Sequence, residues 1–241
     1  MNRQWTTTEE DLACDEALLD ACEAGEPGTE KGVLRFYAAT SPSVVVGYGN
    51  RIATEVNVSA CDAAGVPILR RSSGGGTVVL GPGCLAYALV LPIDAAPSLA
   101  SVTGTNRWIM ERHRSALETA CGRAVSVRGH TDLTLGELKF SGNAQRRRQR
   151  AVLFHGTLLL AMDLERVATW LPLPSVEPDY RRGRGHAAFL INFPVSEPRV
   201  REIFCEAWEV TESWDPDSGL DDRVTYWMRD RYGDVRWHRR F

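Results

Sequence analysis

The chain has 241 residues, of which 44% are hydrophobic and 24% are charged, which is the composition of an ordinary globular protein. Its formal net charge of −3 argues against nucleic acid as a partner, because nucleic-acid binding usually leaves a basic surface. The N-terminal residues do not resemble a signal peptide, and no apolar run approaches the roughly 18 residues of a membrane span, so we expect a cytoplasmic protein that binds no membrane.

In chain order, the first predicted element is a helix from about Glu9 to Cys22 that is capped by Thr8. Short hydrophobic runs then predict strands at Val33–Ala38, Ser43–Tyr48, Val66–Arg70, Thr77–Leu80, Cys84–Leu91, Ala124–Arg128, Leu133–Leu135, Leu138–Ser141, Ala151–Phe154 and Gly156–Ala161. Helical spacing predicts further helices at Val56–Gly65, Thr103–Cys121, Asp163–Leu171, Ser196–Val210 and around Asp221–Arg231. We expect one α/β domain over residues 1–241, with a core at about 11–210 and a tail at 211–241.

A glycine-rich loop separates two of these predicted strands. Gly74, Gly75 and Gly76 have no Cβ, so their backbone can approach a ligand closely and their N–H groups can surround an anion. Arg70 and Arg71 stand before them and offer forked donors suited to carboxylate or phosphate. A flexible hairpin turn would explain the glycines alone, but the paired arginines favour a ligand-binding loop.

Lysine is rare in this chain. Of the 28 basic residues only Lys31 and Lys139 are lysine, and Lys139 lies in the glycine-containing stretch Lys139–Ala144. Arginine cannot replace a compact ammonium that must sit between two ligand oxygens. We therefore expect Lys139 to have a chemical role.

Several other polar residues fall in the same hairpin-rich region as Lys139, and they could line one cleft together with the glycine loop. They are Asp132, Ser141, Gly142, His155, Gly156 and Thr157. When a carboxylate attacks the α-phosphate of ATP, negative charge spreads over the phosphoryl oxygens, and a fixed lysine with oriented N–H groups stabilises that charge. An aspartate such as Asp132 could hold the Mg²⁺ that accompanies ATP.

Three motifs resemble those of the lipoate–protein ligase A family, which has the biotin/lipoate protein ligase catalytic-domain fold. The motifs are RRSSGGGTV at Arg70–Val78, KFSGNA at Lys139–Ala144 and FHGTLL at Phe154–Leu159. The resemblance extends over roughly Asp11 to Trp208. It implies an α/β fold with a mixed, largely antiparallel sheet flanked by helices.

The resemblance also implies roles for individual residues. Lys139 would be catalytic, and Asp132 would bind Mg²⁺. The nucleotide would contact Arg71, Gly76, Thr77, Val78, Val79 and Lys139. The lipoyl or acyl group would contact Arg70, Ser73, Gly74, Gly75, Ser141, Gly142, Ala144, His155, Gly156 and Thr157.

The reaction implied by the resemblance has two steps. Lipoate or octanoate would react with ATP to give an acyl-AMP, and a lysine of an acceptor lipoyl domain would then take the acyl group. Acceptors of this kind are the E2 components of 2-oxoacid dehydrogenases and the H-type protein of glycine cleavage. The chain is too short for the extra C-terminal domain that family ligases often have, so a separate small accessory subunit is a further expected partner.

Three alternatives remain open. Related enzymes transfer octanoyl groups from acyl carrier protein through a cysteine, without ATP. This chain has no cysteine at Thr131 or in the span Gly156–Pro174, which favours the ligase. A non-catalytic accessory subunit is the second alternative, against which Lys139 in a lysine-poor chain speaks, and biotin ligation is a distant third.

Two features are interpreted structurally. The run Arg146–Arg150 is most simply a solvated hairpin tip, with a docking patch for an acidic protein as the alternative. His113 on the long helix is expected to be packed rather than to bind a ligand, and Cys84 is expected to be a buried strand residue.

Overall fold

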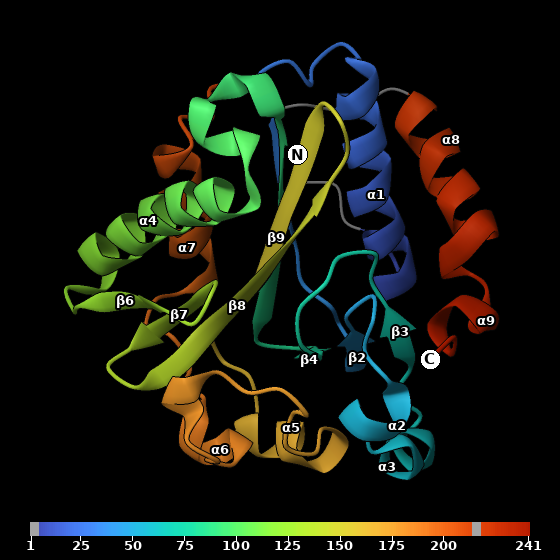
Figure 1. Ribbon diagram of the computed structural model, residues 1–241, viewed down its shortest axis with the longest axis vertical. Helices are drawn as coiled ribbons and strands as arrows, with labels where there is room; N and C mark the ends of the chain where they lie inside the picture. Colours follow the sequence, from blue (N-terminus) through green and yellow to red (C-terminus); the bar gives the residue numbers. More distant parts are fainter. Residues whose placement is uncertain (1–4, 214–217) are drawn as a thin grey trace.

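The computed structural model describes residues 5–213 and 218–241, whose strands form two sheets (Figure 1). The larger sheet is antiparallel throughout and has the order β1 (Val33–Tyr37), β5 (Cys84–Pro92), β9 (Ala151–Leu159), β8 (Leu138–Arg147), β7 (Asp132–Leu135) and β6 (Val125–Arg128). The smaller sheet has the order β3 (Ile68–Arg70), β2 (Ser43–Val46) and β4 (Val78–Leu80). The expected mixed, largely antiparallel α/β architecture is therefore confirmed.

Helices cover both faces of the larger sheet. On one side α1 (Thr8–Ala24) lies beside α8 (Ser218–Trp227), and on the other α4 (Val102–Cys121) lies beside α7 (Glu197–Ala207) (Figure 1). The shorter helices are α2 (Ile52–Glu55), α3 (Val58–Ala64), α5 (Leu164–Trp170), α6 (His186–Phe189) and α9 (Val235–His238). No helix in the described ranges is both long and apolar enough to cross a membrane.

Strand β5 shows how the two layers are built. Its alternate residues Ala86, Ala88 and Val90 join the core that faces α1, whereas Leu85, Tyr87 and Leu89 join the core that faces α4 and α7. Side chains of a strand alternate between the two faces of a sheet, so a continuous apolar run is what a strand buried on both faces requires.

The first helix begins one residue earlier than the sequence predicts. Thr7, not Thr8, is its N-cap: the Thr7 hydroxyl accepts from the N–H of Glu10, and the Glu10 carboxylate accepts from the N–H of Thr7. This reciprocal arrangement satisfies two backbone donors that a helix terminus would otherwise leave unpaired. The prediction of Thr8 as the cap was wrong because several threonines in a row are equally suitable caps by composition.

The glycine loop is not a hairpin turn. Strands β3 and β4, which the loop joins, do not pair with each other; β3 pairs in parallel with β2, and β4 pairs antiparallel with the other edge of β2. The loop therefore crosses the end of the central strand, where the Tyr48 N–H donates to the Ser73 carbonyl. This excludes the flexible-hairpin interpretation of the glycines.

The hairpin of β8 and β9 differs from the prediction in two respects. The strand is continuous through His155, which pairs with Ala144. The arginine run does form the hairpin end, where Arg150 is exposed, but the run is only partly solvated: Arg147 donates to the Leu99 carbonyl, and Arg148 forms ion pairs with Glu16 and Asp20 of α1. The acidic face of α1 provides these partners, which a local reading of the run does not reveal.

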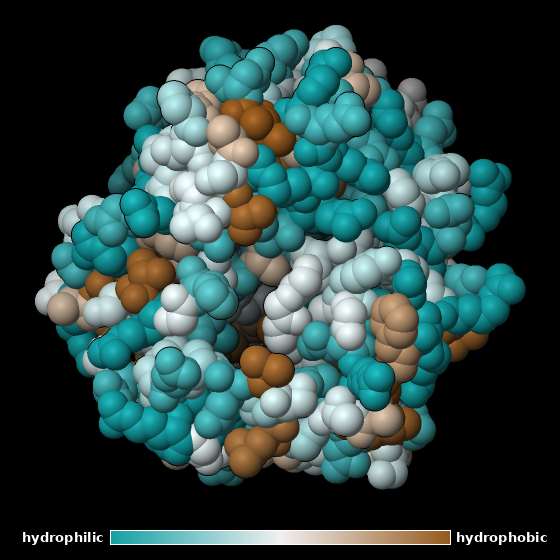
Figure 2. Space-filling model, in the orientation of Figure 1, coloured by the Kyte–Doolittle hydropathy of each residue, from teal (hydrophilic) through white to brown (hydrophobic). Residues whose placement is uncertain are grey.

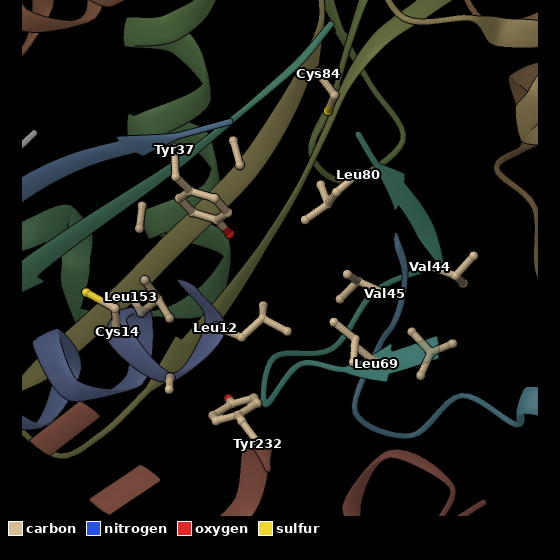
Figure 3. Close-up of a cluster of buried hydrophobic side chains, with 14 of the residues drawn as sticks. Leu12, Cys14, Tyr37, Val44, Val45, Leu69, Leu80, Cys84, Leu153 and Tyr232 are labelled. Carbon is tan, nitrogen blue, oxygen red and sulfur yellow. The ribbon is translucent and has the colours of Figure 1, made fainter. Parts of the chain in front are cut away.

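The C-terminal segment is helical, as expected, but it is part of the core rather than an appended tail. Leu220, Val224 and Trp227 of α8 and Tyr232 of the following π-helical turn, Met228–Tyr232, are buried with the residues of α1. Figure 3 shows Tyr232 beside Leu12 in this cluster. The Tyr232 hydroxyl also donates to Glu16, which is itself buried.

Candidate active site

A cavity of about 90 Å³ lies where the smaller sheet meets the β8–β9 hairpin. A hollow is visible near the centre of the face in Figure 2, between β8 and the loop that enters β4. The lining residues are Thr77, Val78, Val79, Lys139, Phe140, Ser141, Gly142, Thr157, Leu159, Met162, Val167, Leu171, Arg181, His186, Phe189 and Leu190. The wall is thus mainly apolar, with the cationic side chains at Lys139 and Arg181.

Lys139 lies in this cavity wall together with the residues that follow the glycine loop. Its Nζ is 2.7 Å from Oδ1 of Asp132, and the other oxygen of Asp132 accepts from the Tyr180 hydroxyl at 2.8 Å. Burial, together with the neighbouring Asp132 carboxylate, raises the pKa of Tyr180, so this phenol remains a donor. The Lys139 side chain is about one quarter exposed, so its ammonium is held by Asp132 yet is accessible from the cavity.

Arg71 shapes the glycine loop from inside. Its Nη2 donates to the carbonyls of Gly74 and Gly76 at 2.6 and 2.7 Å, and its Nη1 donates to the Val45 carbonyl. In a trans peptide the C=O and the following N–H point in opposite directions. Holding these two carbonyls against Arg71 therefore turns the N–H groups of Gly75 and Thr77 away from it.

These N–H groups remain available to a ligand. Among the described residues, no hydrogen bond uses the N–H of Gly74, Gly75, Gly76 or Thr77 as a donor. Gly75 has φ +87°, which favours glycine, and a Cβ at Gly74 or Gly76 would meet no atom within 4 Å. The loop thus presents open backbone donors of the kind that bind anions.

A second set of contacts ties the loop to α1. The hydroxyl of Ser73 is 2.6 Å from Nε2 of His155, whose Nδ1 is 3.0 Å from Oδ2 of Asp15. Asp15 is in turn paired with the fully buried Arg35. The order Ser, His, Asp is that of a hydrolase triad, but Ser73 is only 1% exposed and also accepts from Arg71 Nε, so it anchors the loop and is closed to substrate.

The sequence-predicted residues fall into two groups. Those that line the cavity are Thr77, Val78, Val79, Lys139, Ser141, Gly142 and Thr157. Arg71, Ser73 and His155 lie behind the loop and hold it, and Gly75 approaches Ala144, the Cβ of which is 3.6 Å from an ideal Cβ position on Gly75. Gly156 packs so tightly on Asn143 that a Cβ there would lie 1.8 Å from Oδ1.

Arg70 lies outside the cavity lining. Its guanidinium is fully buried and donates to the carbonyls of Gly47, Tyr48 and Asn50. Because this guanidinium is buried outside the cavity, we do not retain Arg70 as an acyl-binding residue. Arg70 instead supports the loop between β2 and α2.

Sequence reasoning missed the outer wall of the cavity. Arg181 stacks on the Phe189 ring, its carbon Cζ 4.6 Å from the ring centroid, and Nε2 of His186 is 3.0 Å from the Pro172 carbonyl. Burial lowers the pKa of both Arg181 and His186. The only local signal was the run of basic residues from Tyr180 to His186, which a surface loop would show equally.

The residues present do not form a protein-held metal site. Both oxygens of Asp132 are already engaged, by Lys139 and Tyr180. Within residues 5–213 and 218–241, no group of three or more His, Cys, Asp and Glu side chains could hold a metal ion. The expected binding of Mg²⁺ by Asp132 is therefore not supported by this donor set.

None of the six cysteines lines the cavity, and none is in a disulfide. Cys84, as expected, is a buried strand residue, and burial raises its pKa to about 12. Burial likewise raises the pKa of Cys14 and of Cys22 to about 11. Such thiols are poor nucleophiles, because the thiolate is the reactive form.

Known proteins resemble this chain over most of its length. The family model of the lipoyl protein ligase A/B catalytic domain matches residues 7–187. A protein of Aeropyrum pernix provisionally named lipoate-protein ligase A is 32% identical over 198 residues, which cover 82% of this chain and 69% of that protein. Octanoyltransferase LipM of Carboxydothermus hydrogenoformans is 31% identical over 232 residues, covering 83% of this chain and 82% of the relative.

A solved structure shares the fold. It is that of a bipartite lipoate protein ligase and its E2 lipoyl domain from Thermoplasma acidophilum, with a TM-score of 0.81 at 23% identity over 98% of this chain and 94% of the other.

Proposed function

The chain belongs to the lipoyl protein ligase A/B catalytic domain family, and on that premise we propose that it is an ATP-dependent lipoate–protein ligase. It activates lipoate or octanoate as the acyl-AMP and transfers the acyl group to a lysine of a lipoyl domain. One observation supports this most directly: the Lys139 ammonium and the residues that follow the open glycine loop line one cavity, and no cysteine lines it.

The first step joins two anions, so charge neutralisation decides its rate. A carboxylate oxygen of the fatty acid attacks the α-phosphorus of ATP, the bond from that phosphorus to the bridging oxygen breaks, and pyrophosphate leaves. Lys139 faces the carboxylate and α-phosphate oxygens, while the N–H groups of Gly75 and Thr77 donate to phosphate oxygens. Arg71 fixes those donors in advance, so little reorganisation is needed during the reaction.

Asp132 prepares Lys139 for this step. Its carboxylate, 2.7 Å from Nζ, holds the ammonium in the cavity wall until the substrate oxygens take its place. Tyr180 keeps Asp132 in position through the second oxygen. We propose this positioning role for Asp132 in place of metal binding.

In the second step, the acceptor lysine nitrogen attacks the acyl carbonyl carbon, the bond to the phosphate oxygen breaks, AMP leaves and the amine releases a proton. The acyl chain lies along the apolar wall, to which Val79, Leu159 and Phe189 contribute. Burial of each methylene in such a wall is worth about 0.8 kcal/mol, so the chain length of the substrate is set there.

The proposed acceptor is a lipoyl domain, of an E2 component or of an H-type protein. The structure of a bipartite ligase and its E2 lipoyl domain, which shares this fold, supports this proposal. It also supports the proposal that a separate accessory subunit takes part.

The test supplies a lipoyl domain with lipoate, octanoate or octanoyl-carrier protein, each with and without ATP, and measures the acceptor mass. We expect acylation by the free acids only with ATP, and none from octanoyl-carrier protein without it. Acylation by the carrier protein without ATP would reject ligation in favour of octanoyl transfer, the activity named for the Carboxydothermus relative. No acylation from any donor, with or without an accessory subunit, would favour a non-catalytic role.

A further inference from the structure

We propose that Trp237 and His238, in the C-terminal segment, are positioning residues for the glycine loop, because they replace a missing strand beside β3. This inference concerns residues outside the matched family region, which ends at residue 187. It rests on the proposed function only in assigning ATP as the ligand of the loop.

Strand β3 is an edge strand: within the part of the chain that the structure describes, its only partner in the sheet is β2. Arg71 N–H bonds to the Val46 carbonyl on the β2 side. Both backbone polar groups of a strand residue point to one side, and neighbouring residues alternate, so the N–H and C=O of Arg70 point to the open side. They would be left without strand partners there.

Two side chains of the C-terminal segment supply those partners. The Arg70 N–H donates to Nδ1 of His238 at 2.9 Å, and the Arg70 carbonyl accepts from the Trp237 indole N–H at 2.8 Å. An acceptor and a donor thus stand where a neighbouring strand would place its carbonyl and N–H. The backbone adds to this, since Nε of Arg70 donates to the His238 carbonyl.

The tautomer of His238 fits this role. Its other nitrogen, Nε2, is 2.8 Å from the Tyr232 carbonyl, which can only accept, so Nε2 carries the proton and Nδ1 is free to accept. Burial lowers the pKa of His238, and the Arg70 cation adds to this shift. The bond to the Tyr232 carbonyl and the carboxylates of Glu9 and Asp234 offset only part of it. The neutral form that the bond to Arg70 needs is therefore the stable one.

The effect reaches the glycine loop through adjacent residues. Arg70 immediately precedes Arg71, which holds the Gly74 and Gly76 carbonyls. The C-terminal segment therefore fixes the residue from which the loop starts.

The test compares Trp237→Phe and His238→Ala with a matched control, Trp227→Phe. Trp227 belongs to the same segment, and its indole N–H donates to Asp20, far from β3. His238→Asn retains an acceptor near the position of Nδ1 and serves as the conservative variant. The readouts are hydrogen–deuterium exchange at the N–H groups of Tyr48 and Arg71, which bond to the carbonyls of Ser73 and Val46, with β9 as the internal reference, and the affinities for ATP and for lipoate.

We expect Trp237→Phe and His238→Ala to speed exchange at the N–H groups of Tyr48 and Arg71 and to weaken ATP binding about three- to tenfold, as the loss of one hydrogen bond predicts. Lipoate affinity should change less, His238→Asn should show a smaller effect than His238→Ala, and the control should leave both readouts unchanged. Equal changes in the control, or unchanged exchange at the N–H groups of Tyr48 and Arg71, would overturn the inference. If the parent protein binds no ATP, the proposed function fails while the exchange data still decide this inference.

Discussion

Gly142 and Lys139 illustrate how closely single residues define the site. An ideal Cβ on Gly142 would lie 2.9 Å from Nζ and 3.0 Å from Cε of Lys139. A side chain at this position would therefore move the ammonium away from the place where Asp132 holds it. The glycine of the Lys139–Ala144 motif is required by the neighbouring lysine rather than by the backbone, which has no positive φ there.

We predict that Gly142→Ala lowers the rate of acyl-AMP formation by about tenfold or more, because a displacement near 1 Å can cost about a hundredfold in rate. The thermal midpoint should fall by only a few degrees. The measurement is lipoate-dependent release of pyrophosphate. Gly49→Ala is the control, since a Cβ there would meet nothing within 4 Å; a Gly142→Ala rate equal to that of the control would contradict the prediction.

The guanidinium of Arg71 binds oxygens of the protein itself. The sequence predicts that its guanidinium binds the nucleotide, whereas the structure shows three of its nitrogens bound to loop oxygens and to Val45. Its burial lowers its pKa to about 10. Any influence on the nucleotide therefore passes through the backbone donors that it orients.

At the level of elements, the loop is held from two sides. Helix α1 reaches it through Asp15, His155 and Ser73, and the C-terminal segment reaches it through Arg70. The contacts come from α1, β9 and α9, which are far apart in sequence. A loop that binds an anion with its backbone needs such support, because its glycines are otherwise free to adopt many conformations.

This arrangement predicts the outcome of Ser73→Ala. The change removes the acceptor for Arg71 and the partner of His155, so we expect a loss of about 1–3 kcal/mol in unfolding free energy. Ligation should be slower yet measurable, because Ser73 does not touch the reacting atoms. Denaturant unfolding and a ligation assay measure the two effects. Complete loss of turnover in a folded variant would instead indicate a nucleophilic serine.

At the scale of the whole molecule, buried histidines link stability to pH. His113 of α4 is fully buried where α4 packs against α7. Its Nε2 accepts from the Trp208 indole N–H at 2.9 Å. Burial lowers its pKa to about 3. Below about pH 6.5 this histidine is therefore protonated in the unfolded chain but stays neutral in the folded chain, so the free energy of unfolding decreases as the pH falls.

We predict that His113 contributes a slope of about 1.4 kcal/mol per pH unit between about pH 6 and pH 4. Asp11, whose pKa burial raises to about 6, acts in the opposite direction, so the comparison with His113→Gln isolates the histidine. Chemical denaturation at several pH values should show a shallower slope in that variant. Parallel curves for the two proteins would show that His113 does not titrate as the structure requires.

Much of the site is readable from local sequence. The sequence predicts that the glycine loop, Lys139 and the strand Thr77–Leu80 border one cleft. In the structure Thr77, Val78, Val79 and Lys139 line one cavity. Motifs of this kind are short, and strand alternation fixes which way their residues point.

Other features depend on pairing over long distances. The separation of β3 and β4 by β2, the arginine at position 181 in the cavity wall and the partners of Arg70 in α9 join segments that no local pattern connects. The sequence predicts a tail at 211–241 because the apolar residues of this segment are spaced among many charges. Its burial follows from the acidic and apolar face of α1, on which it packs.

The most direct test of the account uses the two lysines of the chain. Lys139→Ala should reduce lipoate-dependent exchange of pyrophosphate into ATP by about a hundredfold or more, as loss of a group that stabilises developing charge does. Lys31 is exposed and has no assigned role, so Lys31→Ala should catalyse pyrophosphate exchange at the rate of the unaltered protein. Exchange by Lys139→Ala at that same rate, or no lipoate-dependent exchange in the unaltered protein, would contradict the central claim.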